Sequence, residues 1–229
     1  MFHIVRNYDR VPASLVEGYA DLDVATVHEA RGKQGAMAAA IKPLYSGMKV
    51  LGTALTVRCQ PGDNLMLHKA LDILSQGEVL VVDIGGWEGG PWGELMSISA
   101  QARGAGGLVI DGYVRDGEAI RTLGFNVFSR GLSVNGTSKE NLGLLNHPVS
   151  CGGVIVEPGD LVIGDDDGVC VVPKAAAEAV LTRARTRQEE ESVSRKRFAR
   201  GETLWEVADF QSVATAKGMI EEPVDAEAS

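Results

Sequence analysis

The stretch Gly106-Gly107-Leu108-Val109-Ile110-Asp111-Gly112-Tyr113-Val114-Arg115-Asp116 decides the fold class and points to the chemistry. A short apolar run bounded by glycines is typical of a strand buried in an α/β sheet. Arg115 and Asp116 follow that strand, and ligands bind at such strand ends. Arginine grips a carboxylate through two parallel hydrogen bonds, and aspartate offers hard oxygen ligands to a divalent cation. The pair suits a small oxo-acid held on a metal ion, although a surface ion pair, with Asp116 capping a helix from Gly117, fits the same residues.

A second apolar run, Val81-Val82-Asp83-Ile84, leads into a glycine-rich loop and then a helical pattern from Trp92 to Ala102. The free N–H groups of a helix start can bind an anion, and Glu94 falls in that first turn. Twenty residues lie between Glu94 and Arg115, enough for a helix, a turn and the next strand. Parallel strands would therefore bring Glu94, Arg115 and Asp116 to one sheet edge. The alternative for Glu94 is an acidic residue that favours the helix dipole.

Periodicity and turn signals predict the remaining elements. We expect Asp165-Asp166-Asp167-Gly168 to form a tight hairpin turn, because it lacks the alternating ligands and the distal glutamate of a calcium loop. We expect His28 and His68 to pack among apolar neighbours. The other predicted elements are short helices within 11–30 with Ser14 as a candidate cap, helices over 64–74, 92–103, 117–123 and 174–200, and strands over 49–59, 79–84, 108–111, 126–129 and 169–172, with more near Val154 and Leu161.

Composition favours a metabolic enzyme. The 229 residues carry a net charge of −9, which argues against nucleic-acid binding because phosphate contacts need clustered Lys and Arg. The three cysteines have no CxxC spacing, which argues against a disulfide framework or a zinc site and for a reducing cytoplasm. No apolar run is long enough to span a bilayer, and Met1–Arg10 lacks the apolar core of a signal peptide. We therefore expect a cytoplasmic protein with no nucleic-acid or membrane partner.

Five stretches resemble the class II 4-hydroxy-4-methyl-2-oxoglutarate/4-carboxy-4-hydroxy-2-oxoadipate aldolase family, the RraA-like family that also contains the regulator of ribonuclease E activity A. The specific part is the spacing between an acidic residue and the Arg-Asp pair. That acidic position is usually aspartate in the aldolases and typically not acidic in the ribonuclease regulators; here it is Glu94. The resemblance covers about Val24 to Gly201, through Val24-Ala25-Thr26-Val27-His28, Gly62-Asp63-Asn64 to His68, the glycine-rich loop with Glu94, Arg115-Asp116, and Pro158-Gly159-Asp160 to Asp165-Asp166-Asp167-Gly168-Val169.

The resemblance implies an α/β fold. The implied fold is a single RraA-like swivelling β/β/α-type domain over residues 1–229, with a central sheet flanked by helices and a long C-terminal helix. In the helix pattern from Lys174, the apolar stripe fades after Arg185 into charged residues. A helix that loses its core-facing stripe suits a contact with a neighbouring subunit. The resemblance accordingly implies a homotrimer or homohexamer in which residues 174–229 reach that neighbour.

The resemblance also implies a site for a small 2-oxo-acid substrate and a divalent metal, Mg2+ or Mn2+. Asp116 would be the metal ligand. Glu191 would be donated across the subunit boundary, and Glu189 and Glu190 are adjacent alternatives. The residues implied as catalytic are Glu94, Arg115, Lys139 and Glu191, and those implied to bind substrate are Gly93, Leu95, Met96 and Arg115.

The expected activity is metal-dependent retro-aldol cleavage of 4-hydroxy-2-oxo acids, such as 4-hydroxy-4-methyl-2-oxoglutarate or 4-carboxy-4-hydroxy-2-oxoadipate. It would release pyruvate and be accompanied by oxaloacetate decarboxylation. The alternative is a protein-binding regulator of ribonuclease E without aldolase activity. A methyltransferase is disfavoured, because Trp87 occupies a position where the nucleotide loop after Asp83 would need glycine.

Overall fold

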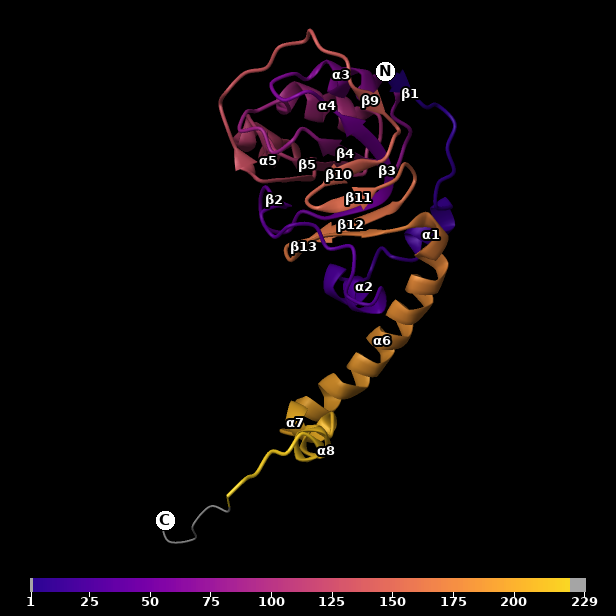
Figure 1. Ribbon diagram of the computed structural model, residues 1–229, viewed down its shortest axis with the longest axis vertical. Helices are drawn as coiled ribbons and strands as arrows, with labels where there is room; N and C mark the ends of the chain where they lie inside the picture. The colour runs from indigo at the N-terminus through magenta and orange to yellow at the C-terminus, as the bar shows by residue number, and fades with distance from the viewer. Residues whose placement is uncertain (1, 223–229) are drawn as a thin grey trace. The chain divides into compact units, whose positions relative to one another are not determined.

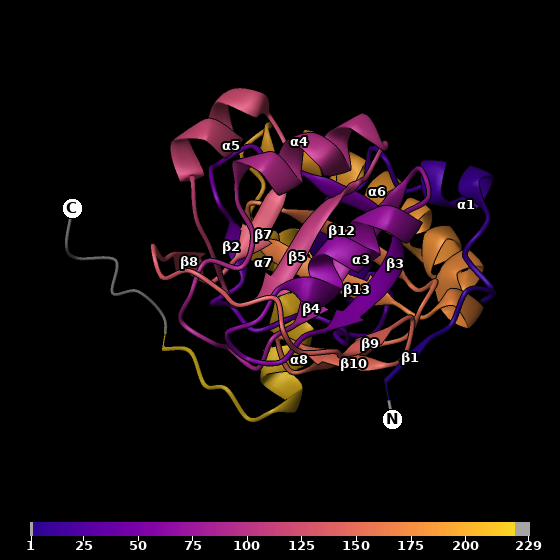
Figure 2. The same ribbon diagram turned by 90° about the horizontal axis from the view of Figure 1, so that it is seen from above.

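The structure is a computed structural model that describes residues 2–222, and its chain divides into two compact units between Ala184 and Arg185. Within the described residues, nine strands of the first unit form one mixed sheet (Figures 1 and 2). Its centre is parallel, because β3 pairs with β4, β4 with β5 and β5 with β7 in the same direction. These strands are β3 (Val50–Arg58), β4 (Glu78–Asp83), β5 (Gly107–Asp111) and β7 (Val127–Ser129).

The remaining strands extend this sheet or form two-stranded ladders beside it. β12 (Leu161–Asp165) pairs antiparallel with β3 and with β13 (Gly168–Val172). The edges are β1 (His3–Ile4) with β9 (Leu144–Leu145) on one side and β2 (Lys42–Pro43) on the other. The separate ladders are β6 (Tyr113–Val114) with β8 (Gly131–Leu132), and β10 (Val149–Cys151) with β11 (Val154–Val156).

Three helices follow the central strands in turn and lie together on one side of β4 and β5 (Figures 1 and 2). They are α3 (Leu65–Ile73), α4 (Glu94–Ala102) and α5 (Gly117–Leu123). This strand–helix alternation brings the loops after β4 and β5 to the same edge of the sheet. The predicted α/β fold with a central sheet flanked by helices is confirmed.

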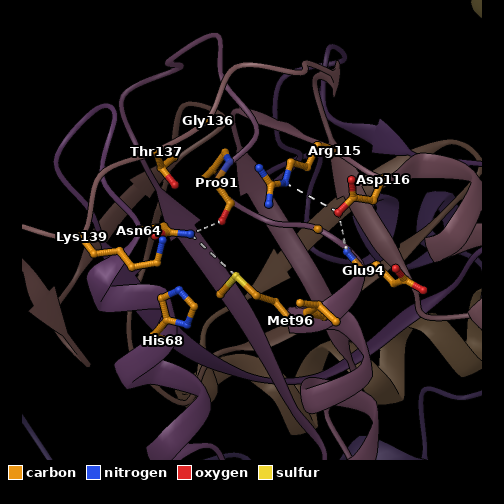
Figure 3. A pocket seen from close by; sticks show the side chains of 12 residues that line it. Asn64, His68, Pro91, Glu94, Met96, Arg115, Asp116, Gly136, Thr137 and Lys139 are labelled. Atoms are coloured by element: carbon orange, nitrogen blue, oxygen red, sulfur yellow. Dashed lines mark hydrogen bonds and ion pairs between the residues drawn. The ribbon is translucent and has the colours of Figure 1, made fainter.

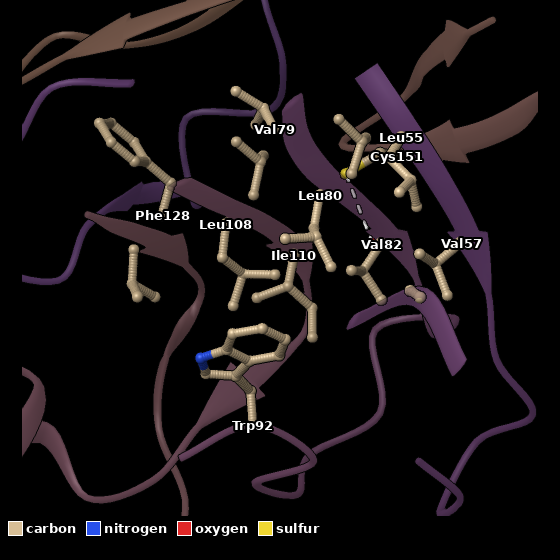
Figure 4. Packing of buried hydrophobic residues seen from close by; sticks show 14 of the residues in the cluster. Leu55, Val57, Val79, Leu80, Val82, Trp92, Leu108, Ile110, Phe128 and Cys151 are labelled. Carbon is tan, nitrogen blue, oxygen red and sulfur yellow. Dashed lines mark hydrogen bonds between the residues drawn. The ribbon is translucent and has the colours of Figure 1, made fainter. Parts of the chain in front are cut away.

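Two buried clusters stabilise this unit. The larger one includes the contact between the sheet and α3–α5, where Leu80, Leu108 and Ile110 are fully buried with Trp92 (Figure 4). The smaller one packs α1 (Ala13–Glu17), α2 (Val24–Ala30) and the first turns of α6 (Ala177–Phe198) on β12 and β13. Trp92 bears directly on the site: its indole donates to the Ser97 hydroxyl at 2.8 Å and so anchors the start of α4.

Several local predictions fail at helix starts. Ser14 is not a cap, because α1 begins one residue earlier, at Ala13. The N-cap position is held by Pro12, whose backbone has no N–H group to leave unpaired. α4 begins at Glu94 rather than Trp92, because Gly93 is extended (φ −153°) and Trp92 serves the core. The hairpin turn is confirmed, with Asp165 paired to Gly168.

The second unit contains the later turns of α6 (Ala177–Phe198), preceded by a 3-10 turn at Lys174–Ala176, and the helices α7 (Leu204–Val207) and α8 (Phe210–Ala216). The long C-terminal helix predicted from residue 174 is confirmed. A capping box between Thr203 and Glu206 starts α7. Among the described helices, none is long and apolar enough to cross a membrane.

Candidate active site

The loop between β4 and α4 approaches the residues after β5 so closely that glycine is required. A Cβ atom on Gly93 would lie 2.3 Å from Asp116 Oδ2, and one on Gly90 would lie 2.8 Å from the Arg115 Cβ atom. The backbone N–H of Arg115 donates to the Trp92 carbonyl at 2.8 Å and joins the two loops. Gly90 and Gly93 therefore allow the loop after β4 to pack closely against the residues after β5 at this edge of the sheet.

Asp116 has a backbone conformation that directs its carboxylate into this edge. It is in the left-handed region (φ 58°, ψ 38°), which is uncommon for a residue other than glycine. The alternative that Asp116 caps the next helix is wrong: it occupies the N-cap position of α5, but its side chain makes no capping hydrogen bond there. Asp116 Oδ2 instead accepts from the backbone N–H of Glu94 at 3.1 Å. Such strain is often found where a side chain must serve a site.

Arg115 and Asp116 lie side by side at the mouth of this edge. The Arg115 Nε atom is 3.6 Å from Asp116 Oδ2, and the side chains are 50% and 42% exposed. The second carboxylate oxygen of Asp116, Oδ1, makes no hydrogen bond within residues 2–222. The guanidinium and one carboxylate oxygen are therefore accessible to a ligand.

The start of α4 supplies unpaired donors to the same place. Only Glu94 of its first residues finds an acceptor, namely Asp116; the backbone N–H groups of Leu95 and Met96 have none within the described chain. Helix N-termini with free N–H groups attract anions. The Glu94 side chain is exposed and carries a carboxylate next to this cradle.

A cavity of about 530 Å³ joins these groups (Figure 3). The structure brings together around it every predicted site residue of the first unit: Gly93, Glu94, Leu95, Met96, Arg115, Asp116 and Lys139. Glu191 lies in the second unit, where Arg187 and Arg195 are each 3.0 Å from its carboxylate. Its predicted place beside the cavity of a neighbouring subunit stays a prediction.

Sequence reasoning missed the wall that faces Arg115. Asn64 and His68 line the cavity from the start of α3, and Thr137 lines it from the loop after β8. The prediction that His68 packs among apolar neighbours is wrong, because its side chain is exposed and faces the cavity. The four-residue spacing of Asn64 and His68 could have indicated a shared face of one helix.

The Asn64 side chain keeps one hydrogen-bond acceptor, its Oδ1 atom, unpaired within the described residues. Its side-chain NH2 group donates to the Pro91 carbonyl at 2.8 Å, which fixes the amide orientation. Its Oδ1 atom is buried without a hydrogen-bond partner in the part of the chain that the structure describes. A buried acceptor of this kind is unusual and costs about 1–3 kcal/mol unless a partner reaches it.

Lys139 and His68 make this end of the cavity basic. Partial burial and the positive charge of Lys139 lower the pKa of His68. His68 therefore favours the neutral form beside a lysine cation. Figure 3 shows both side chains across the cavity from Arg115 and Asp116. The cavity thus has Lys139 at one end, and Arg115 together with the acidic residues Asp116 and Glu94 at the other.

The carboxylates at this cavity could hold a divalent metal that keeps most of its water. No cluster of three or more His, Cys, Asp or Glu side chains that could hold a metal occurs within residues 2–222. A tight zinc site of protein ligands is absent from that part of the chain. Mg2+ keeps several waters and often takes only one or two carboxylates, so Asp116 with its unengaged Oδ1 fits such an ion.

Comparison with known proteins identifies the family and the fold. The profile of the RraA-like family, described as Aldolase/RraA, matches residues 20–171. The chain is 42% identical over 149 residues to a Halalkalibacterium halodurans protein named "Putative 4-hydroxy-4-methyl-2-oxoglutarate aldolase", covering 65% of this chain and 71% of that protein. Two solved structures resemble the fold.

The first is an uncharacterized protein from Pseudomonas syringae (TM-score 0.79, 29% identity), and the match covers 87% of this chain and 98% of that one. The second is RraAS2 of Streptomyces coelicolor, titled an unusual member of the RNase ES inhibitor RraA protein family. Its TM-score is 0.73 and its identity 31%, over 82% of this chain and 100% of that one.

Proposed function

The chain belongs to the RraA-like family, and we propose that within this family it is a divalent-metal-dependent lyase that cleaves 4-hydroxy-2-oxo acids to release pyruvate. The observation that carries the proposal is that Glu94, Arg115 and Asp116 line one cavity. A protein-binding module needs no exposed acid at such a place, whereas carbon–carbon cleavage needs a base there.

We assign the metal to Asp116, with Mg2+ or Mn2+ as the ion. When bound, such an ion supplies Lewis acidity to the 2-oxo oxygen and carboxylate of the substrate. The free N–H groups of Leu95 and Met96 would hold the substrate carboxylate, with Gly93 allowing the backbone to come close. Gly93, Leu95 and Met96 are thus the proposed substrate-binding positions.

Arg115 stabilises the charge that develops during cleavage. Breaking the C3–C4 bond of a 4-hydroxy-2-oxo acid leaves the electron pair on C3, delocalised onto the 2-oxo oxygen as the enolate of pyruvate. A guanidinium placed beside that oxygen interacts with it more strongly as the charge grows. Arg115 does not act as the base, because a guanidinium does not deprotonate in proteins.

The base is a carboxylate. It takes the proton of the C4 hydroxyl as the C3–C4 bond breaks and the C4–O bond becomes a carbonyl. Glu94 stands at the cavity of its own subunit. Glu191 of a neighbouring subunit is the second candidate, in a trimer or hexamer. Lys139, at the opposite end, supplies a cation for the far part of an anionic substrate.

Oxaloacetate decarboxylation follows from the same chemistry. Loss of carbon dioxide from C3 of oxaloacetate leaves the same pyruvate enolate, so the groups that stabilise the enolate serve both reactions. No hydroxyl proton has to be removed in decarboxylation. A variant that lacks only the base should therefore lose cleavage more than decarboxylation.

The second candidate is a protein-binding regulator on the same fold, which the likeness to the Streptomyces coelicolor RraAS2 structure favours. A pyruvate-release assay over a panel of 4-hydroxy-2-oxo acids and oxaloacetate, with Mg2+, Mn2+ or EDTA, tests the lyase proposal. We expect metal-dependent pyruvate release from at least one aldol substrate. Retention of ribonuclease E in a pull-down, without pyruvate release from any substrate, would favour the regulator.

A further inference from the structure

We propose that Asp63 is a positioning residue that holds Lys139 at the cavity. This inference rests on the proposed function of the same cavity. Lys139 lies in an irregular segment between β8 and β9 whose side chains are mostly exposed. Such a segment would not by itself place a lysine at a defined point. Asp63, only 1% exposed, supplies the missing anchor.

The residues on both sides of Lys139 are bound to one oxygen atom. The Ser138 hydroxyl and the Glu140 backbone N–H each donate to Asp63 Oδ2 at 2.7 Å. Asn141 adds its backbone N–H at 3.0 Å and its side-chain NH2 at 3.3 Å to the same oxygen. Lys139 is thus fixed through its neighbours on either side.

The other oxygen of Asp63 connects this segment to α3. Asp63 Oδ1 accepts from the backbone N–H of Leu65, the first residue of α3, at 2.8 Å. Ser138 also exchanges backbone hydrogen bonds with the same turn: its N–H donates to the Gly62 carbonyl at 2.9 Å and its carbonyl accepts from Asn64 at 3.1 Å. Asp63 therefore sets the Lys139 segment against the helix that carries Asn64 and His68.

The carboxylate form is required for this set of contacts. Burial opposes ionisation of Asp63, but the hydrogen bonds from Glu140, Leu65, Ser138 and Asn141 outweigh it and lower the pKa of the carboxyl well below its usual range. An asparagine would place an NH2 donor against other donors at either oxygen position, since both oxygens accept hydrogen bonds. The Asp63→Asn variant keeps the size of the side chain and loses the anchor.

The test is a double-mutant cycle of Asp63→Asn and Lys139→Met, with two readouts. The first is kcat/KM for the best substrate of the pyruvate-release panel. Losing a charge-assisted contact to substrate should lower it by about 10- to 100-fold in either single variant. In the Lys139→Met background, Asp63→Asn should change it by less than about threefold.

The second readout needs no activity: it is the pKa of His68, measured by NMR. Lys139 lowers that pKa, so both single variants should raise it, and the double variant should rise no further than Lys139→Met. If Asp63→Asn is poorly folded, Ser138→Ala removes a single donor and should shift His68 in the same direction by a smaller amount.

The matched control is Asp160→Asn. Asp160 is also buried and also accepts backbone N–H groups, from Glu157 at 3.0 Å and Lys174 at 2.9 Å, but does not line the cavity. The Asp160→Asn substitution should lower stability and leave kcat/KM and the His68 pKa unchanged.

An Asp63→Asn effect on kcat/KM that persists without Lys139, or an unchanged His68 pKa in Asp63→Asn, would overturn the proposal. If wild-type protein released no pyruvate while His68 still shifted as expected, the positioning role would stand and the proposed function would fail.

Discussion

Arg115→Lys separates a catalytic arginine from a surface ion pair. Lysine keeps the positive charge and loses the planar fork that can point two donors at an oxo-acid. The Arg115 side chain is half exposed, and its Nε is 3.6 Å from Asp116 Oδ2, a distance too long for a strong hydrogen bond. An exposed pair of this kind contributes about 0–1 kcal/mol to folding. The fold should therefore tolerate the change.

The expected effect on turnover is much larger. Loss of one preorganised donor to a developing oxyanion costs about 10²–10³ in kcat, or about 2.7–4 kcal/mol of transition-state stabilisation. We expect the melting temperature of Arg115→Lys to change by no more than about 2–4 °C, the shift that 1 kcal/mol gives in a chain of this size. Pyruvate release, measured with saturating Mg2+, should fall at least about 100-fold.

Arg121→Lys is the matched control. Arg121 lies on α5, just after the site, and its guanidinium stands 5.3 Å from the Tyr45 ring centre. It does not line the cavity, so the same substitution should leave kcat within about twofold. Near-wild-type turnover in Arg115→Lys would refute the reasoning and reduce Arg115 to a surface residue. An equal loss in Arg121→Lys would point to a general effect on the fold.

Four other outcomes are expected. Activity should vanish in excess EDTA and return with Mg2+ or Mn2+, and Asp116→Asn should weaken Mn2+ binding measured by electron paramagnetic resonance; full activity of metal-stripped protein would contradict this. Glu191→Gln and Arg115→Lys chains, each nearly inactive, should regain pyruvate release when refolded together, because some interfaces would pair intact Arg115 with intact Glu191; no recovery in verified mixed oligomers would count against donation across subunits. Burial raises the pKa of Cys59 to about 12, so a thiol reagent should label the native protein slowly and label all three cysteines in denaturant; rapid native labelling would contradict the buried assignment. Because the pKa of Asp63 is lower when folded, its stabilisation is present above the ordinary carboxyl range and is lost as pH falls through and below it; urea midpoints should therefore drop on acidification more in wild type than in Asp63→Asn.

The sequence predicted the central strands and the helix after each of them. The runs that become β4 and β5 are apolar at nearly every position, because both faces of a central parallel strand are covered. The glycine-rich loop after β4 marks the edge where Arg115 and Asp116 lie. The spacing from Glu94 to Arg115 was sufficient to bring the two together, because strand and helix lengths fix how far the chain travels.

The opposite wall of the cavity could not be read in the same way. His68 lies in a helix that mixes buried and exposed positions, and the local sequence does not indicate that its side chain faces a cavity. Thr137 and Lys139 belong to an irregular segment, whose position depends on hydrogen bonds to a residue more than 70 positions earlier in the chain. Contacts of that range carry no periodic signal.

The carboxylates near this edge of the sheet differ in how many of their oxygens already accept a hydrogen bond. Asp63 accepts hydrogen bonds at both oxygens, and Asp111 accepts from Arg130 at 2.5 Å and from the Gly152 N–H at 3.0 Å. These two serve the fold, because each of their oxygens already accepts a hydrogen bond from another part of the chain. One oxygen of Asp116 accepts a hydrogen bond from the Glu94 N–H, and the other has no hydrogen bond within the described chain. An aspartate held in a left-handed conformation, with one oxygen tied and one free, is oriented for a ligand before the ligand arrives. That difference in occupancy, more than the presence of acidic residues, supports Asp116 as the proposed metal ligand.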